Sequence, residues 1–176
     1  MTSTEAPIEI VPYDSDWVVR FEEEAAVLRR ELAPWLAGPV EHIGSTAVPG
    51  LAAKPVIDIM AGVETLAASL PAIAVATGLG YCYWPYQADV EHWFCKPSPT
   101  HRTHHLHLIP FGDSQWQRAI AFRDHLRSHQ QTAREYEALK QRLALEHRFD
   151  REAYTDAKRP FVERVTDHAL RTRHEC

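Results

Sequence analysis

The sequence predicts an α+β fold, in which a mixed β-sheet core with flanking helices is followed by a C-terminal helical extension. Two observations favour this class. Strand-like and helical segments alternate through residues 1–112, and from Gln115 onward every apolar pattern has helical spacing. We therefore expect an α/β core at 1–112 and a helical part at 113–176, packed together as a single compact unit. A chain of 176 residues is long enough for this pair and for no further domain.

In the first third of the chain, residues 8–13 alternate and predict a short edge strand. Asp14 and Asp16 are candidate N-caps of a helix that Pro34 ends. The apolar positions of this helix recur at helical spacing: Trp17, Phe21, Ala25, Leu28 and Leu32. A short strand is expected at 40–45. It runs into a turn at Gly44 and Ser45, and 47–54 predicts a tight loop or one helical turn.

The middle of the chain predicts the rest of the sheet. Residues 55–63 are β-branched and largely apolar, which is typical of a buried strand. Residues 64–78 predict a helix that Gly78 and Gly80 end. Strands are expected at 81–86, 91–96 and 104–111, the last two joined by a turn at 97–103. Helical spacing then predicts three helices, around 116–126, 133–143 and 154–165.

Composition excludes several classes of protein. An apolar content of 45% with 10% aromatic residues argues against disorder. No apolar run approaches the roughly 18 residues of a membrane span, and residues 1–12 lack the basic start of a signal peptide. We therefore expect a soluble, cytoplasmic protein without a membrane partner. Three cysteines with no CxxC pair give no disulfide framework.

Charge and histidine content are unevenly distributed. The net charge of −5 argues against nucleic-acid binding. Residues 1–112 hold 6 Lys and Arg against 13 Asp and Glu, whereas residues 113–176 hold 13 against 11. A cationic C-terminal part would suit an anionic substrate, although an ordinary solvated Arg-rich helical surface explains the same split. The chain has 11 histidines, six of them between His42 and His107.

The first chemical motif runs from His42 to Asp58. A Gly44–Ser45 turn after a strand exposes backbone N–H groups and a hydroxyl, which together can cradle phosphate oxygens. Asp58 is a lone carboxylate within an apolar strand. Because a buried unpaired carboxylate is costly, Asp58 should meet a metal, a cation or hydrogen-bond donors. A strand-end Asp that caps a neighbouring loop is the alternative.

The second motif lies at 101–109. On a strand, His105 and His107 share one face, while Leu106 and Leu108 point to the other face and into the core. Two imidazoles at this spacing are typical of metal ligation or phosphate contact, and the polar outer face of a strand is the alternative. Arg102 is a candidate bidentate phosphate ligand, or else an ordinary surface arginine in a turn.

The third feature is a set of cations inside apolar helical patterns: Arg123, Arg127, Lys140 and Lys158. Tyr136 and Tyr154 each precede a lysine by four residues, so each Tyr–Lys pair shares a helix face. Such pairs could grip a triphosphate or a base. Lysines that extend along core tyrosines toward solvent would give the same pattern without a function.

These motifs resemble those of the GrpB family. The resemblance covers about residues 10–165 and is carried by His42-Ile-Gly-Ser-Thr-Ala-Val-Pro-Gly-Leu-Ala-Ala-Lys-Pro-Val-Ile-Asp-Ile59, Arg102-Thr-His-His-Leu-His-Leu108, Ala121-Phe-Arg-Asp-His-Leu-Arg127, Tyr136-Glu-Ala-Leu-Lys140 and Tyr154-Thr-Asp-Ala-Lys158. It implies a nucleotidyltransferase-like fold, and similar domains occur fused to dephospho-CoA kinase.

In the nucleotidyltransferase superfamily, a Gly-Gly or Gly-Ser turn precedes two carboxylates on the next strand, and a third lies on a later strand. These carboxylates hold two divalent ions. By resemblance, Asp58 matches the first carboxylate, Met60 stands at the second position, and the later strand offers His105 and His107. The resemblance then implies one divalent metal (Mg, Mn or Zn) on Asp58, His105 and His107, with imidazole favouring Mn or Zn. Alternatively, the histidines act as acid/base groups or phosphate contacts without a metal.

The resemblance therefore implies binding of an NTP and transfer of a nucleotidyl or phosphoryl group to a small acceptor. The expected catalytic residues are Asp58, His105 and His107. The expected substrate- and phosphate-binding residues are His42, Gly44, Ser45, Thr46, Lys54, Arg102, Arg123, Tyr136, Lys140, Tyr154 and Lys158.

The same residues suggest three alternative classes of function. One is a non-catalytic module that binds a nucleotide, a CoA precursor or another anion, the second carboxylate having been lost at Met60. A histidine-triad hydrolase is disfavoured because Ile109 occupies the third alternate position. A serine or cysteine hydrolase is disfavoured because Gly44-Ser45-Thr46 is not a G-x-S-x-G elbow.

Overall fold

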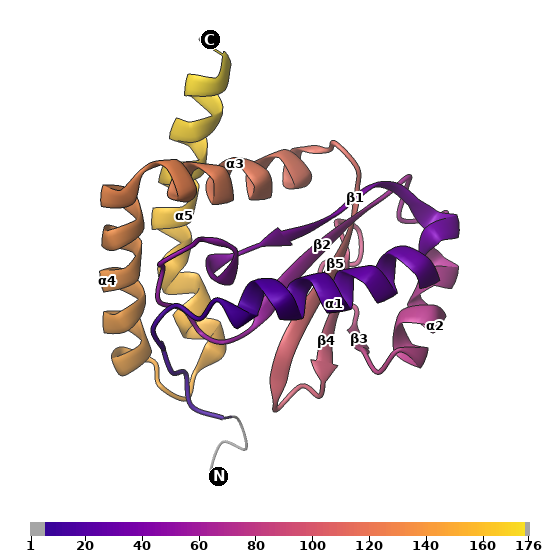
Figure 1. Cartoon of the computed structure of the whole chain (residues 1–176), viewed down its shortest axis with the longest axis horizontal. Helices are drawn as coiled ribbons and strands as arrows, with labels where there is room; N and C mark the ends of the chain where they lie inside the picture. Colours follow the sequence, from indigo (N-terminus) through magenta and orange to yellow (C-terminus); the bar gives the residue numbers. More distant parts are fainter. Residues whose placement is uncertain (1–5, 175–176) are drawn as a thin grey trace.

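One five-stranded mixed sheet organises the chain, in the order β1-β2-β5-β4-β3, with helices on both faces (Figure 1). The computed structural model describes residues 6–174. Its strands are β1 (Leu36–Ile43), β2 (Ile57–Val63), β3 (Cys82–Trp84), β4 (His92–Pro97) and β5 (Arg102–Pro110). Its helices are α1 (Asp16–Glu31), α2 (Leu70–Gly78), α3 (Ser114–Ser128), α4 (Gln130–Glu146) and α5 (Arg151–His174), with short 3-10 turns η1 (Ala33–Trp35) and η2 (Ser45–Ala47). The predicted α+β class with a mixed sheet is confirmed.

The central strands β2 and β5 run parallel, and the other neighbouring pairs of strands are antiparallel. The parallel pair is joined by a long connection that contains α2, β3 and β4. This arrangement places β2 and β5 in the middle of the sheet. β2 is apolar apart from Asp58, because both of its faces are covered, whereas β5 alternates leucines with histidines and has one apolar face.

One face of the sheet packs against α1 and α2. The predicted apolar positions of α1 are buried, with Phe21 the most exposed at 6%, and they join Ile59, Leu106 and Leu108 in the main core. Fully burying side chains of this size contributes roughly 1.5–3 kcal/mol each. This core fixes which face of β5 is apolar, and it therefore leaves the histidine face turned toward the other helices.

The opposite face packs against α3, α4 and α5. Met60, Ile109 and Trp116 form one buried cluster between the sheet and α3. Tyr136 and Leu126 belong to another cluster, which also contains Val48 and Leu51 of the η2 region. The helical part thus covers the sheet. The predicted boundary between the α/β core and the helical part, between residues 112 and 113, falls in the connection from β5 to α3. The division of the chain into these two parts stays a prediction.

Several predicted elements differ from the structure, including the following three. Residues 8–13 form no strand and contribute only an isolated bridge from Val11 to Ala53. Helix α2 begins at Leu70 instead of residue 64, because the preceding residues form turns around Thr65, whose Oγ1 accepts a hydrogen bond from the backbone N–H of Ala68 at 3.0 Å. Strand β1 begins four residues before the predicted Val40, and an irregularity in its pairing lies between Leu36 and Val40.

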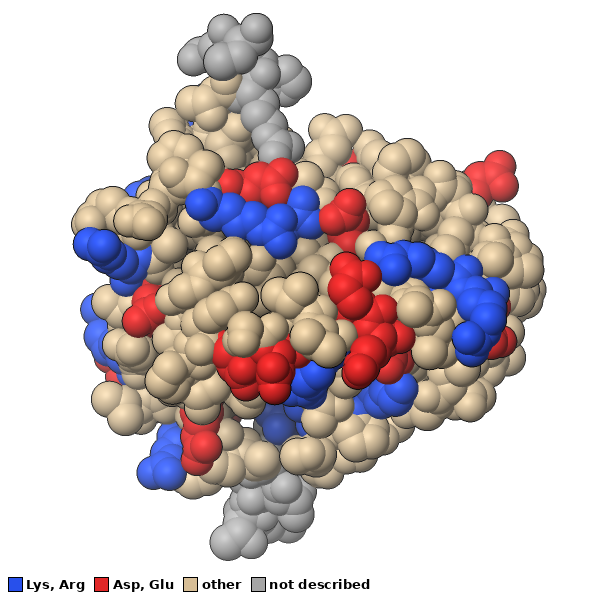
Figure 2. Space-filling view, viewed as in Figure 1, with Lys and Arg blue, Asp and Glu red and all other residues tan. Residues whose placement is uncertain are grey.

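The surface gives two observations that bear on partners. Acidic and basic side chains are interspersed over the face shown in Figure 2. Among residues 6–174, no helix is both long enough and apolar enough to cross a membrane. The predicted cellular compartment stays a prediction.

Candidate functional site

Strand register assembles the candidate site from segments far apart in the sequence. Asp58 of β2 pairs with His105 of β5, which pairs with Cys95 of β4. In the next row on the same face, His107 of β5 lies between Met60 and Trp93. Partners in register lie side by side, and alternate residues share a face. The predicted common face of His105 and His107 is therefore confirmed, and it is the face toward α3, α4 and α5.

Both histidines are paired with carboxylates. His105 Nδ1 lies 2.8 Å from Asp58 Oδ1, and His107 Nδ1 lies 2.6 Å from Glu91 Oε2. The two pairs are largely buried, with 10–27% of each side chain exposed. A carboxylate that accepts a hydrogen bond from Nδ1 fixes the orientation of the ring and directs Nε2 away from it. The expectation that Asp58 meets a hydrogen-bond donor is thereby confirmed.

The pairs open onto a cavity of about 940 Å³ between the sheet and the C-terminal helices. Ten of the residues predicted for the site line this cavity: Ser45, Thr46, Lys54, Asp58, Arg102, His105, His107, Lys140, Tyr154 and Lys158. Four do not line it: His42, Gly44, Arg123 and Tyr136. The residues of the first group contribute charged and titratable side chains to the cavity lining. The residues of the second group lie outside the lining.

The η2 turn forms part of the cavity wall, and Gly44 permits its approach to Asp58. Gly44 has a φ of 72°, and a Cβ at this position would collide with the Asp58 carboxylate. Thr46 Oγ1 donates to the Val56 carbonyl at 3.1 Å and lies 3.0 Å from His42 Nε2. The Thr46 hydroxyl is therefore occupied with holding the turn, and Ser45 lines the cavity beside it.

His42 lies on the opposite face of the sheet from the cavity. Its ring stacks on Phe21 of α1 with centroids 4.7 Å apart. Burial lowers the pKa of His42 to about 4, so the ring is neutral near pH 7. His42 supports Thr46 and does not reach a ligand in the cavity, which differs from its predicted phosphate-binding role.

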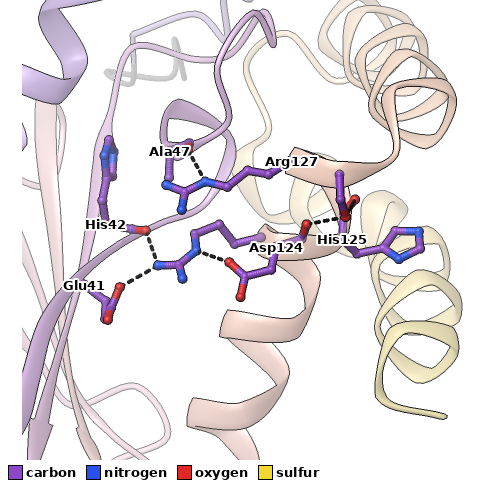
Figure 3. Close-up of polar contacts among 8 residues, drawn as sticks. Glu41, His42, Ala47, Asp124, His125 and Arg127 are labelled. Atoms are coloured by element: carbon purple, nitrogen blue, oxygen red, sulfur yellow. Dashed lines mark hydrogen bonds and ion pairs between the residues drawn. The ribbon is translucent and has the colours of Figure 1, made fainter. Parts of the chain in front are cut away.

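Arg123 and Arg127 of α3 dock that helix onto β1 and η2. Arg123 Nη1 donates to Glu41 Oε2 at 2.6 Å and to the His42 carbonyl at 3.1 Å. Arg127 Nε donates to the Ala47 carbonyl at 2.9 Å; Figure 3 shows this contact beside Glu41, His42 and Asp124. The predicted phosphate ligand Arg123 is thus engaged in an ion pair outside the cavity.

The two predicted Tyr–Lys pairs do share helix faces. Lys140 Nζ lies 4.9 Å from the Tyr136 ring centroid and donates to the Ala52 carbonyl, and Lys158 Nζ lies 4.1 Å from the Tyr154 ring centroid. Burial, reinforced by the charge of Lys158, lowers the pKa of Lys140 to about 7. Burial, reinforced by the charge of Lys54, lowers the pKa of Lys158 to about 8. Two crowded, partly desolvated ammonium groups favour an anion beside them.

Tyr136 is buried beneath this arrangement. Burial raises the pKa of Tyr136 to about 12, so the neutral phenol persists at ordinary pH. Its ring stacks on Phe161 of α5, with centroids 5.2 Å apart. Tyr136 is therefore not a direct cavity-lining group.

The pKa values of the two paired histidines are shifted in opposite directions. Burial lowers the pKa of His105, and the Asp58 partner only partly offsets this effect. Burial also acts on His107, but the charge and hydrogen bond of Glu91 outweigh it and raise the pKa of His107. Neighbouring groups whose pKa values are pushed apart in this way are suited to act as a base and an acid.

The donor set does not form an evident metal centre. Among residues 6–174, no group of three or more His, Cys, Asp and Glu side chains is placed to hold a metal ion. The Nδ1 atoms of both histidines face carboxylates, and Met60 is fully buried against Ile109 and Trp116. One buried nitrogen, His105 Nε2, has no hydrogen-bond partner. Asp58, His105 and His107 therefore do not converge as one three-ligand set.

Several residues that line the cavity are not among those predicted from the sequence. Glu91 is the most important of them. Glu91 precedes β4 and is 8% exposed, and only the pairing of β4 with β5 reveals its contact with His107. Aromatic and basic residues also line the cavity without having been predicted: Trp84, Tyr86, Trp93, Phe149, Arg151 and Arg159. The sequence signal for Glu91 is an acidic residue at the first position of the strand predicted at 91–96, which is too common to single out.

Comparison with known proteins gives consistent matches over most of the chain. The family described as GrpB protein matches residues 7–168. A UPF0157 protein of Pseudomonas aeruginosa is 42% identical over 173 residues, which cover 95% of this chain and 70% of that protein. A dephospho-CoA kinase of Mycolicibacterium paratuberculosis is 38% identical over 79 residues, which cover 43% of this chain and 19% of the kinase.

The fold also matches a solved structure. The crystal structure of the conserved protein GrpB from Enterococcus faecalis aligns with a TM-score of 0.84 and 35% identity, over 93% of this chain and 98% of that one. The family match and the structural match extend over the strands and helices that build the cavity. The chain belongs to the GrpB family.

Proposed function

We propose that the cavity binds an NTP and transfers a nucleotidyl or phosphoryl group from it to a small acceptor. The observation that carries the proposal is the meeting of two carboxylate–histidine pairs with a group of lysines in one cavity of about 940 Å³. Lysines supply charge for phosphate oxygens, and imidazoles supply proton transfer. Together these groups can bind phosphate oxygens and move protons during a phosphoryl transfer.

Anion binding rests on Lys54, Lys140 and Lys158. They come from three separate segments and line the same cavity, and the pKa of both helical lysines is lowered by burial and by a neighbouring lysine. A bound polyphosphate would relieve this repulsion and restore full protonation. Its affinity should therefore exceed that expected from exposed lysines, because the charges are already held in place.

Proton transfer rests on His105 and His107. Neutral His105, oriented by Asp58, would accept the proton of an acceptor hydroxyl as the new oxygen–phosphorus bond forms. Protonated His107, oriented by Glu91, would donate a proton to the leaving oxygen as the old phosphorus–oxygen bond breaks. This assignment follows from the opposite pKa shifts of the two rings and from their adjacent positions on one strand face.

A second candidate is a binding module for a nucleotide or CoA precursor. The buried Met60 at the expected second carboxylate position favours it, since this residue cannot ligate a hard cation. The partial similarity to a protein named dephospho-CoA kinase supports a ligand of the same chemical kind. The divalent metal implied by the family resemblance remains a proposal, and no catalytic step above depends on it.

The test is calorimetric titration of the whole chain with ATP, GTP, CTP, UTP and dephospho-CoA, in separate arms with and without Mg²⁺, Mn²⁺ and Zn²⁺, followed by mass spectrometry of products. We expect one NTP to bind and to react with an acceptor from a panel of small alcohols, amines and phosphates. His105→Gln and His107→Gln should lower turnover by about 10²- to 10⁴-fold while leaving NTP affinity within a few-fold. Exposed His101→Gln is the matched control.

The outcomes separate the candidates. A bell-shaped pH profile of turnover that loses its acidic limb in His105→Gln and its alkaline limb in His107→Gln would support the acid/base assignment. Binding without product in any arm would favour the binding module. Absence of binding to every nucleotide would contradict the proposed function.

A further inference from the structure

Three exposed aromatic side chains gather on the wall of the same cavity. Trp84 and Tyr86 are each 56% exposed and Phe149 is 55% exposed, and all three line it. Within residues 6–174, Phe111 is the remaining aromatic residue among the exposed large hydrophobic side chains. A large aromatic surface left in contact with water around one cavity marks a place where a ligand covers it.

The sheet order separates Trp84, one of these aromatics, from Asp58. Asp58 lies on β2 and His105 on β5, whereas Trp93 lies on β4 and Trp84 on the edge strand β3. Neighbouring strands are about 4.8 Å apart, so three strand spacings, or roughly 14 Å, separate Asp58 from Trp84. The cavity lined by both residues is therefore long enough for an extended nucleotide.

The aromatic end is built from both parts of the fold. Trp84 pairs across the strands with Trp93, whose ring has the Arg102 guanidinium 5.2 Å from its centroid. Phe149 comes from the connection between α4 and α5. The aromatic surface thus includes edge-strand and helical-connection side chains, both on the lining of one cavity.

We propose that Trp84, Tyr86 and Phe149 form the subsite for the planar base of the nucleotide, whose phosphates lie at Lys54, Lys140 and Lys158. This inference rests on the proposed function and adds to it the orientation of the ligand and the residues that distinguish a nucleotide from an inorganic polyphosphate. Every base offers a π-face, so stacking is tolerant of base identity. The subsite therefore selects a nucleoside phosphate as a class more strongly than it selects one base.

The test compares a nucleotide with its phosphate chain alone. Calorimetry on the whole chain measures the affinity for ATP, GTP, CTP and UTP and for inorganic tripolyphosphate. The variants are Trp84→Leu, Tyr86→Leu and Phe149→Leu, with Phe111→Leu as the matched control outside the cavity. Circular dichroism melts confirm that each variant is folded.

We expect the tightest-binding nucleotide to bind at least about tenfold more tightly than tripolyphosphate, because base stacking contributes only to the nucleotide. Trp84→Leu should weaken nucleotide binding by about tenfold, with Tyr86→Leu and Phe149→Leu weakening it to a similar or smaller extent. None of the variants should change the affinity for tripolyphosphate, and Phe111→Leu should change neither affinity.

Each other result counts against the proposal in a distinct way. Equal affinities for nucleotides and tripolyphosphate, unaffected by the three variants, would overturn the base subsite while leaving phosphate binding in place. Parallel loss of both affinities in the variants would assign the aromatics a structural role and overturn it as well. Absence of binding to either kind of probe would remove the base subsite together with the proposed function.

Discussion

At the scale of single residues, the site depends on close support of a few polar groups. Asp58 lies in an apolar strand and forms a hydrogen bond with His105. Burial alone would raise the pKa of Asp58, but the contact with His105 lowers it. Gly44 leaves room for that carboxylate, and His42 holds Thr46 from the opposite face of the sheet. Residues behind the cavity therefore matter to its shape as much as residues that line it.

Gly44→Ala should be more damaging than Gly50→Ala, although both glycines have positive φ, 72° and 79°. Gly44 also has a ψ of −171°, and this combination of angles is essentially restricted to glycine, at a cost on the order of 1–3 kcal/mol for another residue. At Gly44 the new Cβ also collides with the Asp58 carboxylate, whereas nothing lies within 4 Å at Gly50. Urea unfolding should show a larger loss for Gly44→Ala, and NMR of the His105 ring should change only in that variant. Equal losses with an unchanged His105 signal would contradict this account.

His42 should destabilise the fold as the pH falls from 6.5 to 4. Its pKa is about 4 when folded and 6.5 as a free side chain, so the unfolded chain binds more protons in this window. A difference of this size corresponds to a loss on the order of 3 kcal/mol, complete below pH 4. His42→Phe keeps a ring on Phe21 but cannot titrate, so its unfolding free energy should fall less steeply. A wild-type slope in His42→Phe would refute the assignment.

At the scale of elements, β5 is the strand that combines core and site. Leu106 and Leu108 anchor it to α1, and the alternation of a strand then obliges His105 and His107 to face α3, α4 and α5. Helix α3 packs at the β1 edge of the sheet. Arg123 of this helix contacts β1, and Arg127 contacts η2. Because η2 carries Ser45, the position of α3 also fixes the wall of the cavity.

The Arg123–Glu41 ion pair should contribute measurably to this docking. Its atoms are 2.6 Å apart, and 10% of Arg123 and 30% of the Glu41 side chain are exposed. A double-mutant cycle with Arg123→Met and Glu41→Gln, followed by urea unfolding, should give a coupling of about 1–3 kcal/mol. The matched control is the exposed Arg118–Asp167 pair, whose coupling should stay below about 1 kcal/mol. Equal coupling energies for the two pairs would show that burial does not strengthen the Arg123–Glu41 ion pair.

At the scale of the whole molecule, the cavity joins the two predicted parts of the chain. The core supplies Asp58, His105, His107 and Glu91, and the C-terminal helices supply Lys140 and Lys158. Both parts of the chain contribute both signs of charge to the cavity lining, since Lys54 comes from the core and Asp156 from α5. The two signs are also mixed on the molecular face in Figure 2, so the uneven charge along the sequence does not produce a separation of charge in the fold.

The sequence by itself determined the α+β class, the buried strand with Asp58, the shared face of His105 and His107, and the Tyr–Lys pairs. These features follow from the local spacing of apolar and polar residues, which can be read directly along the sequence. Tertiary structure alone decided that Glu91 meets His107, that His42 and Arg123 lie outside the cavity, and that three exposed aromatics share it with the lysines. The physical reason is strand register and helix docking, which bring together side chains separated by 16 to 82 positions and which no local pattern encodes.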